Sequence, residues 1–158
     1  MAFFIQMREE RLNPVRVIYT RRIGAYGKEN AVLMQRWKEW LREHGLFGSD
    51  SVILAIAMDD PSITEASQCR YDVCMVAGES VKVSGNEVYS RELSGGNYVV
   101  FLIEHTSQAV ERAWSESFGY LGQMGYTLDL TRPVMERYAK RLVDWHLCEL
   151  CVPVKERE

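Results

Sequence analysis

Two glutamates, Glu136 and Glu149, lie inside the apolar segments PVMERY and ELCVPVK. A carboxylate inside an apolar strand is costly unless it is paired or faces water. Each could therefore point to solvent on an edge strand, pair with Arg137 or Arg70, or line a wet pocket, and the residues alone favour none of these roles. In an aromatic pocket such a carboxylate would attract a lipophilic cation, to which each good ring adds about 0.5–2 kcal/mol through cation–π contact.

Tyrosine and tryptophan side chains could form the walls of such a pocket, since a tyrosine offers a flat apolar face and a polar tip. The candidates are Tyr19, Tyr26, Tyr98, Tyr138 and Trp114. Trp37, Trp40 and Phe118 recur on helical faces and are better explained as ordinary core. Trp145 falls between two expected strands, where it could act as a lid.

The cysteines include a C-x-x-C motif, Cys148 and Cys151, which zinc and redox sites also use. Residues three apart on a strand point to opposite faces of the sheet. No second C-x-x-C or suitable histidine pair completes a tetrahedral site. We therefore expect free, buried thiols, with no metal and no cofactor.

The chain alternates strand-like and helix-like segments. The pattern predicts a strand over about Val15–Arg22, a helix in KENAVLMQRWKEWLREHG, and strands in SVILAIAM and CRYDVCMVAG. After the connection GESVKVSGNEVY, it predicts a strand over about Asn97–Glu104 and a helix capped by Ser107. Strands at about Pro133–Tyr138 and in HLCELCVPVK follow. The double glycine Gly95–Gly96 indicates a bulge or a close backbone approach.

This order repeats, with pseudo-repeats at about residues 15–78 and 88–155. The closing strands correspond in sequence, CRYDVCMVA to HLCELCVPV, which aligns Asp72 with Glu149 and Cys74 with Cys151. We expect an α+β fold of duplicated β-α-β-β units with a joined antiparallel sheet and both helices on one face. A ligand groove would follow the seam on the other face. Asp72 itself is expected to form a salt bridge with Arg70 or a lysine.

Composition limits the possible partners. The chain has 158 residues, 47% hydrophobic and 26% charged, which fits a single domain over residues 1–158. A net charge of -3 does not indicate the positively charged surface that binds nucleic acid, nor a polybasic segment that would attract the chain to membranes. No segment has the pattern of a transmembrane helix or signal peptide, so we expect a cytoplasmic protein.

The chain resembles the GyrI-like small-molecule-binding domain, also called the AraC effector-binding domain. The similarity lies in VIYTRRIGAYGK, RYDVCMVAG, ELSGGNYVVFLIEHT, AWSESFGYL, PVMERY and ELCVPVK. The family includes drug-binding domains of multidrug-responsive transcription activators and a stand-alone DNA gyrase inhibitor. The resemblance implies an aromatic groove in which Glu136 faces a cationic ligand and Glu149 lies on the last strand. An aromatic residue often follows that second glutamate, and the corresponding residue here is Cys151. Without a helix-turn-helix segment, the chain resembles a stand-alone member of the family.

Three functions follow from the residues and the resemblance. The favoured one is binding of small, lipophilic, cationic molecules for sensing or sequestration, without catalysis. Its ligand-binding residues would be Glu136, Glu149, Tyr138, Tyr19, Tyr26, Tyr98, Trp114 and Cys151. The second is hydrolysis of reactive electrophilic natural products, in which Glu136 or Glu149 positions water and Tyr98 or Tyr26 protonates the leaving group. The third is a protein interaction with gyrase or a regulator, through an exposed surface.

Overall fold

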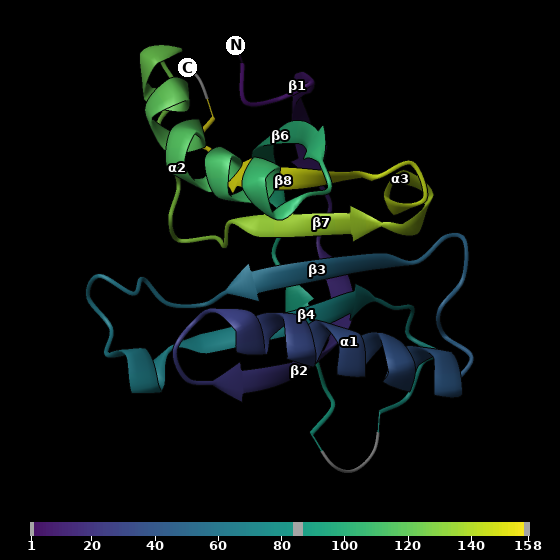
Figure 1. Ribbon diagram of the computed structural model, residues 1–158. Helices are drawn as coiled ribbons and strands as arrows, with labels where there is room; N and C mark the ends of the chain where they lie inside the picture. Colours follow the sequence, from purple (N-terminus) through teal and green to yellow (C-terminus); the bar gives the residue numbers. More distant parts are fainter. Residues whose placement is uncertain (1, 84–86, 157–158) are drawn as a thin grey trace.

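The computed structural model describes residues 2–83 and 87–156, which build one eight-stranded antiparallel sheet (Figure 1). The strands are β1 (Gln6–Leu12), β2 (Val15–Ile23), β3 (Val52–Ala57), β4 (Arg70–Val76), β5 (Tyr89–Leu93), β6 (Gly96–Glu104), β7 (Met135–Ala139) and β8 (Leu147–Pro153). The helices are α1 (Lys28–Glu43), α2 (Ser107–Gln123) and the short α3 (Lys140–Val143), with a 3-10 turn at Ala66–Gln68. The expected α+β class is confirmed.

The predicted repeat is visible in the order of the sheet, β1-β6-β8-β7-β3-β4-β2-β5. The unit β2-α1-β3-β4 has the spatial strand order β3-β4-β2, and the unit β6-α2-β7-β8 has the matching order β7-β8-β6. The two units join where β3 and β7 pair in antiparallel register, from Val52 opposite Ala139 to Ala55 opposite Glu136. The joined sheet was expected, and this pairing is its seam.

The N-terminal segment forms β1, a strand that the sequence pattern did not predict. Its letters, QMREERL, contain too few apolar residues to stand out, yet it pairs along its whole length with β6. At the other edge of the sheet, β5 pairs with β2. The edge strand β1 thus pairs with β6 of the second unit, whereas the next strand in sequence, β2, belongs to the first. The edge strand β5 pairs with β2 of the first unit, whereas the next strand, β6, belongs to the second. The β1–β2 and β5–β6 connections therefore both cross between the two units.

The double glycine marks the place where these two connections meet. Gly95 has a φ of 71°, and a Cβ added there would lie 2.4 Å from the carbonyl oxygen of Leu12 and 2.8 Å from the carbonyl carbon of Asn13. The close backbone approach predicted from Gly95–Gly96 is thus confirmed. Only a residue without a side chain fits this crossing.

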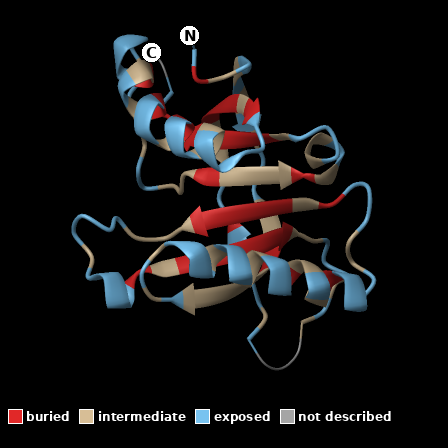
Figure 2. Cartoon of the chain, in the orientation of Figure 1, coloured by how far each residue is buried: buried red, intermediate tan, exposed pale blue. Residues whose placement is uncertain are grey.

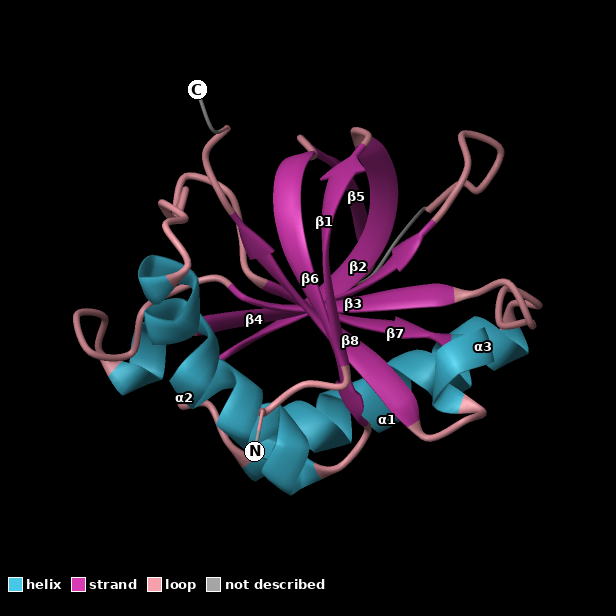
Figure 3. Cartoon of the chain, turned by 90° about the horizontal axis from the view of Figure 1, so that it is seen from above, coloured by secondary structure: helices cyan, strands magenta, loops and turns pink. Residues whose placement is uncertain are grey.

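Both long helices cover one face of the sheet, as expected, while the ends of β1, β2, β5 and β6 curl away on the other side (Figure 3). Trp37 and Leu41 anchor α1, and Ala113 and Leu121 anchor α2. The outer faces of the helices are exposed, β3 and β4 are mostly buried, and β7 between β3 and β8 is mostly of intermediate burial (Figure 2). The N-cap of α2 is Thr106, whose side chain accepts a hydrogen bond from the backbone N–H of Ala109, and not Ser107.

A further core cluster lies on the concave face, away from the helices. It consists of Val17, Leu54, Ile56, Cys74, Leu93, Tyr98, Val100, Met135 and Cys151. Cys148 belongs to the cluster under α2, so the two cysteines of the C-x-x-C point to opposite faces, as strand geometry predicts. Burial raises the pKa of both thiols to about 12. Among the described helices, none is long and apolar enough to span a bilayer.

Candidate ligand groove

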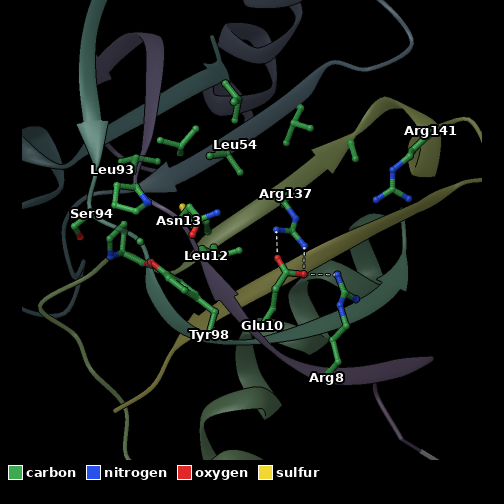
Figure 4. Close-up of a pocket in the computed structure, with 18 residues that line it drawn as sticks. Arg8, Glu10, Leu12, Asn13, Leu54, Leu93, Ser94, Tyr98, Arg137 and Arg141 are labelled. Carbon is green, nitrogen blue, oxygen red and sulfur yellow. Dashed lines mark hydrogen bonds and ion pairs between the residues drawn. The ribbon is translucent and has the colours of Figure 1, made fainter. Parts of the chain in front are cut away.

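A cavity of about 380 Å³ opens on the concave face, between the two units (Figure 4). Residues from both units contribute to its lining, and they come from strands β1 to β7 and from α3. Most of the wall is apolar: Leu12, Pro14, Val15, Val52, Leu54, Val76, Leu93, Pro133, Met135 and Ala139. Its volume and apolar lining are typical of small-molecule sites, which commonly measure about 300–1,000 Å³.

The crossing connections contribute Asn13, Pro14, Ser94 and Gly95 to the lining, and Ser94 lies at the end of the cavity opposite Arg141 (Figure 4). Tyr98 lies beside them, and its hydroxyl donates a hydrogen bond to the carbonyl of Pro133 at 3.0 Å. The guanidinium of Arg132 lies 5.1 Å from the centre of the Tyr98 ring. Burial raises the pKa of Tyr98 to about 12, so this tyrosine contributes a neutral, fixed ring to the wall.

A closed ring of four charged side chains lies at the groove (Figure 4 shows three of them). Arg8 donates to Glu149 at 2.8 Å and to Glu10 at 2.9 Å. Arg137 donates to the other oxygen of Glu149 and to the other oxygen of Glu10, both at 2.9 Å. Two guanidinium groups thus bridge two carboxylates, with contributions from β1, β7 and β8.

This ring compensates the charge of Glu149, which is 2% exposed. A buried carboxylate without such partners would carry a large desolvation cost. Pairing with Arg137 was one of the roles left open by the sequence. Partial burial opposes ionisation of Glu10, but the hydrogen bonds and charges of Arg137 and Arg8 outweigh it and hold the pKa of Glu10 below its ordinary value.

Asp72 is the counterpart of Glu149 in the first unit, as the sequence alignment indicated. It is fully buried on the same face and accepts hydrogen bonds from Arg21 at 2.6 and 2.9 Å and from Arg91 at 2.9 Å. The predicted salt bridge is therefore present, but its predicted partner is wrong. Arg70 instead pairs with Asp59 at 2.9 Å.

The structure does not bring Glu136 and Glu149 together. Arg137 lies opposite Glu149 in the pairing of β7 with β8, so its neighbour Glu136 points to the other face of the sheet. There Glu136 accepts hydrogen bonds from the indole N–H of Trp114 at 2.7 Å and from the hydroxyl of Tyr138. The expectation of one groove containing both carboxylates is corrected to two separate sites.

The remaining candidates are spread over both faces. Tyr19 packs on Tyr89, with Arg91 4.9 Å from its ring centre, beside Asp72 and outside the cavity lining. The hydroxyl of Tyr26 donates to the carbonyl of Arg70 at 2.7 Å, on the helix side. Cys151 is completely buried beneath the groove. Tyr98 is the one predicted ligand-binding residue in the cavity lining.

Sequence reasoning missed Arg8 and Glu10, because it missed β1. A signal was present, since two opposite charges spaced two residues apart lie on one face of a strand. It missed Arg141, which lies in α3 and lines the end of the cavity opposite Ser94. Arginines therefore contribute more to this site than the resemblance implied.

Comparison with known proteins gives the chain its family. The GyrI-like small molecule binding domain matches residues 5–155. The SPbeta prophage-derived protein YosT of Bacillus subtilis (strain 168) is 41% identical over 147 residues, covering 92% of this chain and 97% of that protein. DNA gyrase inhibitor 2 of Dickeya dadantii (strain 3937) is 31% identical over 115 residues, 72% of each protein.

The fold is also that of the solved structure of SAV2435 bound to tetraphenylphosphonium. The TM-score is 0.63 over 96% of this chain and 94% of that one, with 15% sequence identity. At that identity the likeness concerns the fold alone. The match over residues 5–155 and the relative that is 41% identical carry the assignment: this chain belongs to the family of GyrI-like small molecule binding domains.

Proposed function

We propose that the chain binds a lipophilic small molecule in the concave groove. The observation that supports this most directly is the cavity of about 380 Å³ with mainly apolar walls, in a chain of a small-molecule-binding family. Covering apolar wall with an apolar ligand is favourable by roughly 25 cal/mol per Å² removed from water. Ser94 and Tyr98 would limit how far the ligand extends at the end opposite Arg141.

The cationic character expected from the sequence stays a prediction. In its favour, a protein of the same fold has been solved with tetraphenylphosphonium, a lipophilic cation. Against it, Glu10 and Glu149 are both paired with Arg8 and Arg137. The proposed function therefore concerns a lipophilic ligand, and the sign of its charge is a separate question.

A variant that fills the groove tests the proposal. Val52 lines the cavity from β3, and Val52→Trp should occupy space that the ligand needs. We expect calorimetric titration with a panel of lipophilic dyes to show binding by the native chain and at least a roughly ten-fold loss in this variant. Val32→Trp, on the exposed outer side of α1, is the control. Equal binding by Val52→Trp, with an unchanged circular dichroism spectrum, would contradict the proposal.

Hydrolysis of an electrophile is a second candidate, supported by the contact of Glu136 with Tyr138. This pair combines a carboxylate with a phenol, the groups that such chemistry needs. It lies on the helix side of the sheet, so the reaction would not take place in the groove. Turnover lost in Glu136→Gln and retained in Val52→Trp would support an enzyme, and no turnover of a panel of reactive electrophiles would oppose it.

A protein partner is a third candidate, supported by the relative named DNA gyrase inhibitor 2. Such an interaction would use a surface rather than the cavity. Co-purification with gyrase subunits, unaffected by Val52→Trp, would favour it.

A further inference from the structure

The charged side chains around the groove do not balance. Arg8, Arg137 and Arg141 contribute three guanidinium groups, whereas Glu10 and Glu149 contribute two carboxylates. The four members of the ring neutralise one another. Within the described part of the chain, Arg141 has neither a carboxylate nor another acceptor in hydrogen-bond contact, although it lines the cavity. Arg141 is exposed, so water solvates its charge, and within the described residues no carboxylate of the protein competes with a ligand for its guanidinium.

The ring also obstructs a cation. Each of the four carboxylate oxygens already accepts from a guanidinium nitrogen at 2.8 or 2.9 Å. The two guanidinium groups therefore balance the charge of the two carboxylates, and a cationic ligand gains little from Glu10 or Glu149 unless it displaces Arg8 or Arg137. Separating a buried carboxylate from its partner costs about 3–5 kcal/mol, which would oppose binding.

The position of Arg141 suits the head group of an elongated ligand. It lies near one end of the cavity, while Ser94 lies at the other, and apolar side chains occupy the wall between them (Figure 4). A guanidinium binds a carboxylate through two parallel hydrogen bonds. The arrangement matches a molecule with an apolar body and an acidic end.

We propose that the groove selects lipophilic anions, with Arg141 binding the acidic group of the ligand. This inference rests on the proposed function, because it assigns a ligand class to the same groove. Arg137 and Arg8 contribute indirectly, since they keep the carboxylates of the groove engaged and prevent them from repelling the anion.

Three ligands with one alkyl chain test the inference: decanoate, decanol and decylammonium. Calorimetric titration of the full chain should show that decanoate binds most tightly. In Arg141→Gln we expect decanoate to bind roughly ten-fold more weakly, while decanol keeps its affinity. Arg36→Gln removes an exposed arginine from the helix side of the sheet and should change nothing.

The outcomes separate this inference from the proposed function. If decylammonium binds most tightly, or if Arg141→Gln weakens decanol as much as decanoate, the anion class is overturned and the groove still binds lipophilic molecules. If none of the three binds, the inference is overturned, while the dye titration of the native chain and Val52→Trp still decides the proposed function. If they bind and Val52→Trp leaves all their affinities unchanged, the proposed function fails and the inference fails with it.

Discussion

Glu149 shows how one buried carboxylate depends on its partners. It is 2% exposed, and both of its oxygens accept from arginines. Glu149→Gln removes the charge that compensates Arg8 and Arg137, and we expect a loss of about 3–5 kcal/mol in the free energy of unfolding. Urea denaturation measures it.

The control for this prediction is Asp144→Asn. Asp144 forms an exposed pair with Lys140 on α3, so its loss should cost only about 0.3–0.5 kcal/mol. A loss of less than about 1 kcal/mol in Glu149→Gln would mean that the charged ring contributes little to stability.

Glu10 makes the stability of the ring depend on pH. Although partial burial disfavours its charge, Arg137 and Arg8 keep the pKa of Glu10 below its ordinary value, with Glu149 the other charged group of the ring. A carboxyl with a lowered pKa stabilises the fold fully above the ordinary value of about 4.3, and this contribution is lost as the pH falls through the folded-state pKa.

The difference in unfolding free energy between the native chain and Glu10→Gln should therefore be largest near about pH 7 and shrink below about pH 4. Urea titrations of both proteins across this range measure the difference. A difference that stays constant with pH would show that Glu10 contributes through packing alone.

At the residue scale, the sequence predicted the types of interaction better than their partners. It predicted a salt bridge for Asp72 and offered Arg137 as a partner for Glu149, and both ion pairs exist. It could not predict Arg21 for Asp72, because a strand pairing determines which arginine lies opposite. The placement of Glu136 and Glu149 on opposite faces depends on the register of β7 against β8, which no local pattern contains.

Among the elements, the crossing at Gly95 gives the sharpest test. In Gly95→Ala the new Cβ would lie 2.4 Å from the carbonyl oxygen of Leu12, at the end of β1, and at a φ that side chains disfavour. We expect a loss of at least about 1–3 kcal/mol in unfolding free energy. Thermal and urea denaturation measure it.

Gly119 provides the matched control. It lies on the exposed side of α2, and a Cβ added there would meet nothing within 4 Å. Gly119→Ala should be stabilising by up to about 1 kcal/mol, since alanine favours a helix interior. Two glycine variants of equal stability would indicate that the crossing is more adaptable than its geometry suggests.

The sequence predicted most elements because apolar periodicity marks them. Strands β2, β3, β4, β6, β7 and β8 and the helices α1 and α2 all coincide with predicted segments. Apolar periodicity did not predict β1, because this strand lies at a sheet edge, where charged residues are common, and contributes mainly charged side chains. That omission also concealed half of the charged ring, so the acidic groove expected from the sequence is replaced by one whose two carboxylates are both paired with arginines.

At the scale of the whole molecule, the chain path links the two units. The chain starts in the second unit with β1, builds the first unit from β2 to β5, and returns to complete the second with β6 to β8. The charged ring also ties β1 to the second unit, because Arg8 and Glu10 of β1 bind Glu149 on β8 and Arg137 on β7. We therefore propose that residues 1–158 fold as one cooperative domain.

Tryptophans placed in both units allow this proposal to be tested. One variant keeps only Trp37, in the first unit, and another keeps only Trp114, in the second, with the other tryptophans replaced by phenylalanine. In each variant the fluorescence transition in urea should coincide with the circular dichroism transition of the same protein, as cooperative unfolding requires.

Removal of residues 1–12 should break this agreement, because the second unit loses an edge strand and Glu149 keeps Arg137 as its one remaining arginine partner in the ring. A full chain whose Trp114 signal changes before its circular dichroism would instead consist of two units that unfold independently, joined by the short β3–β7 seam.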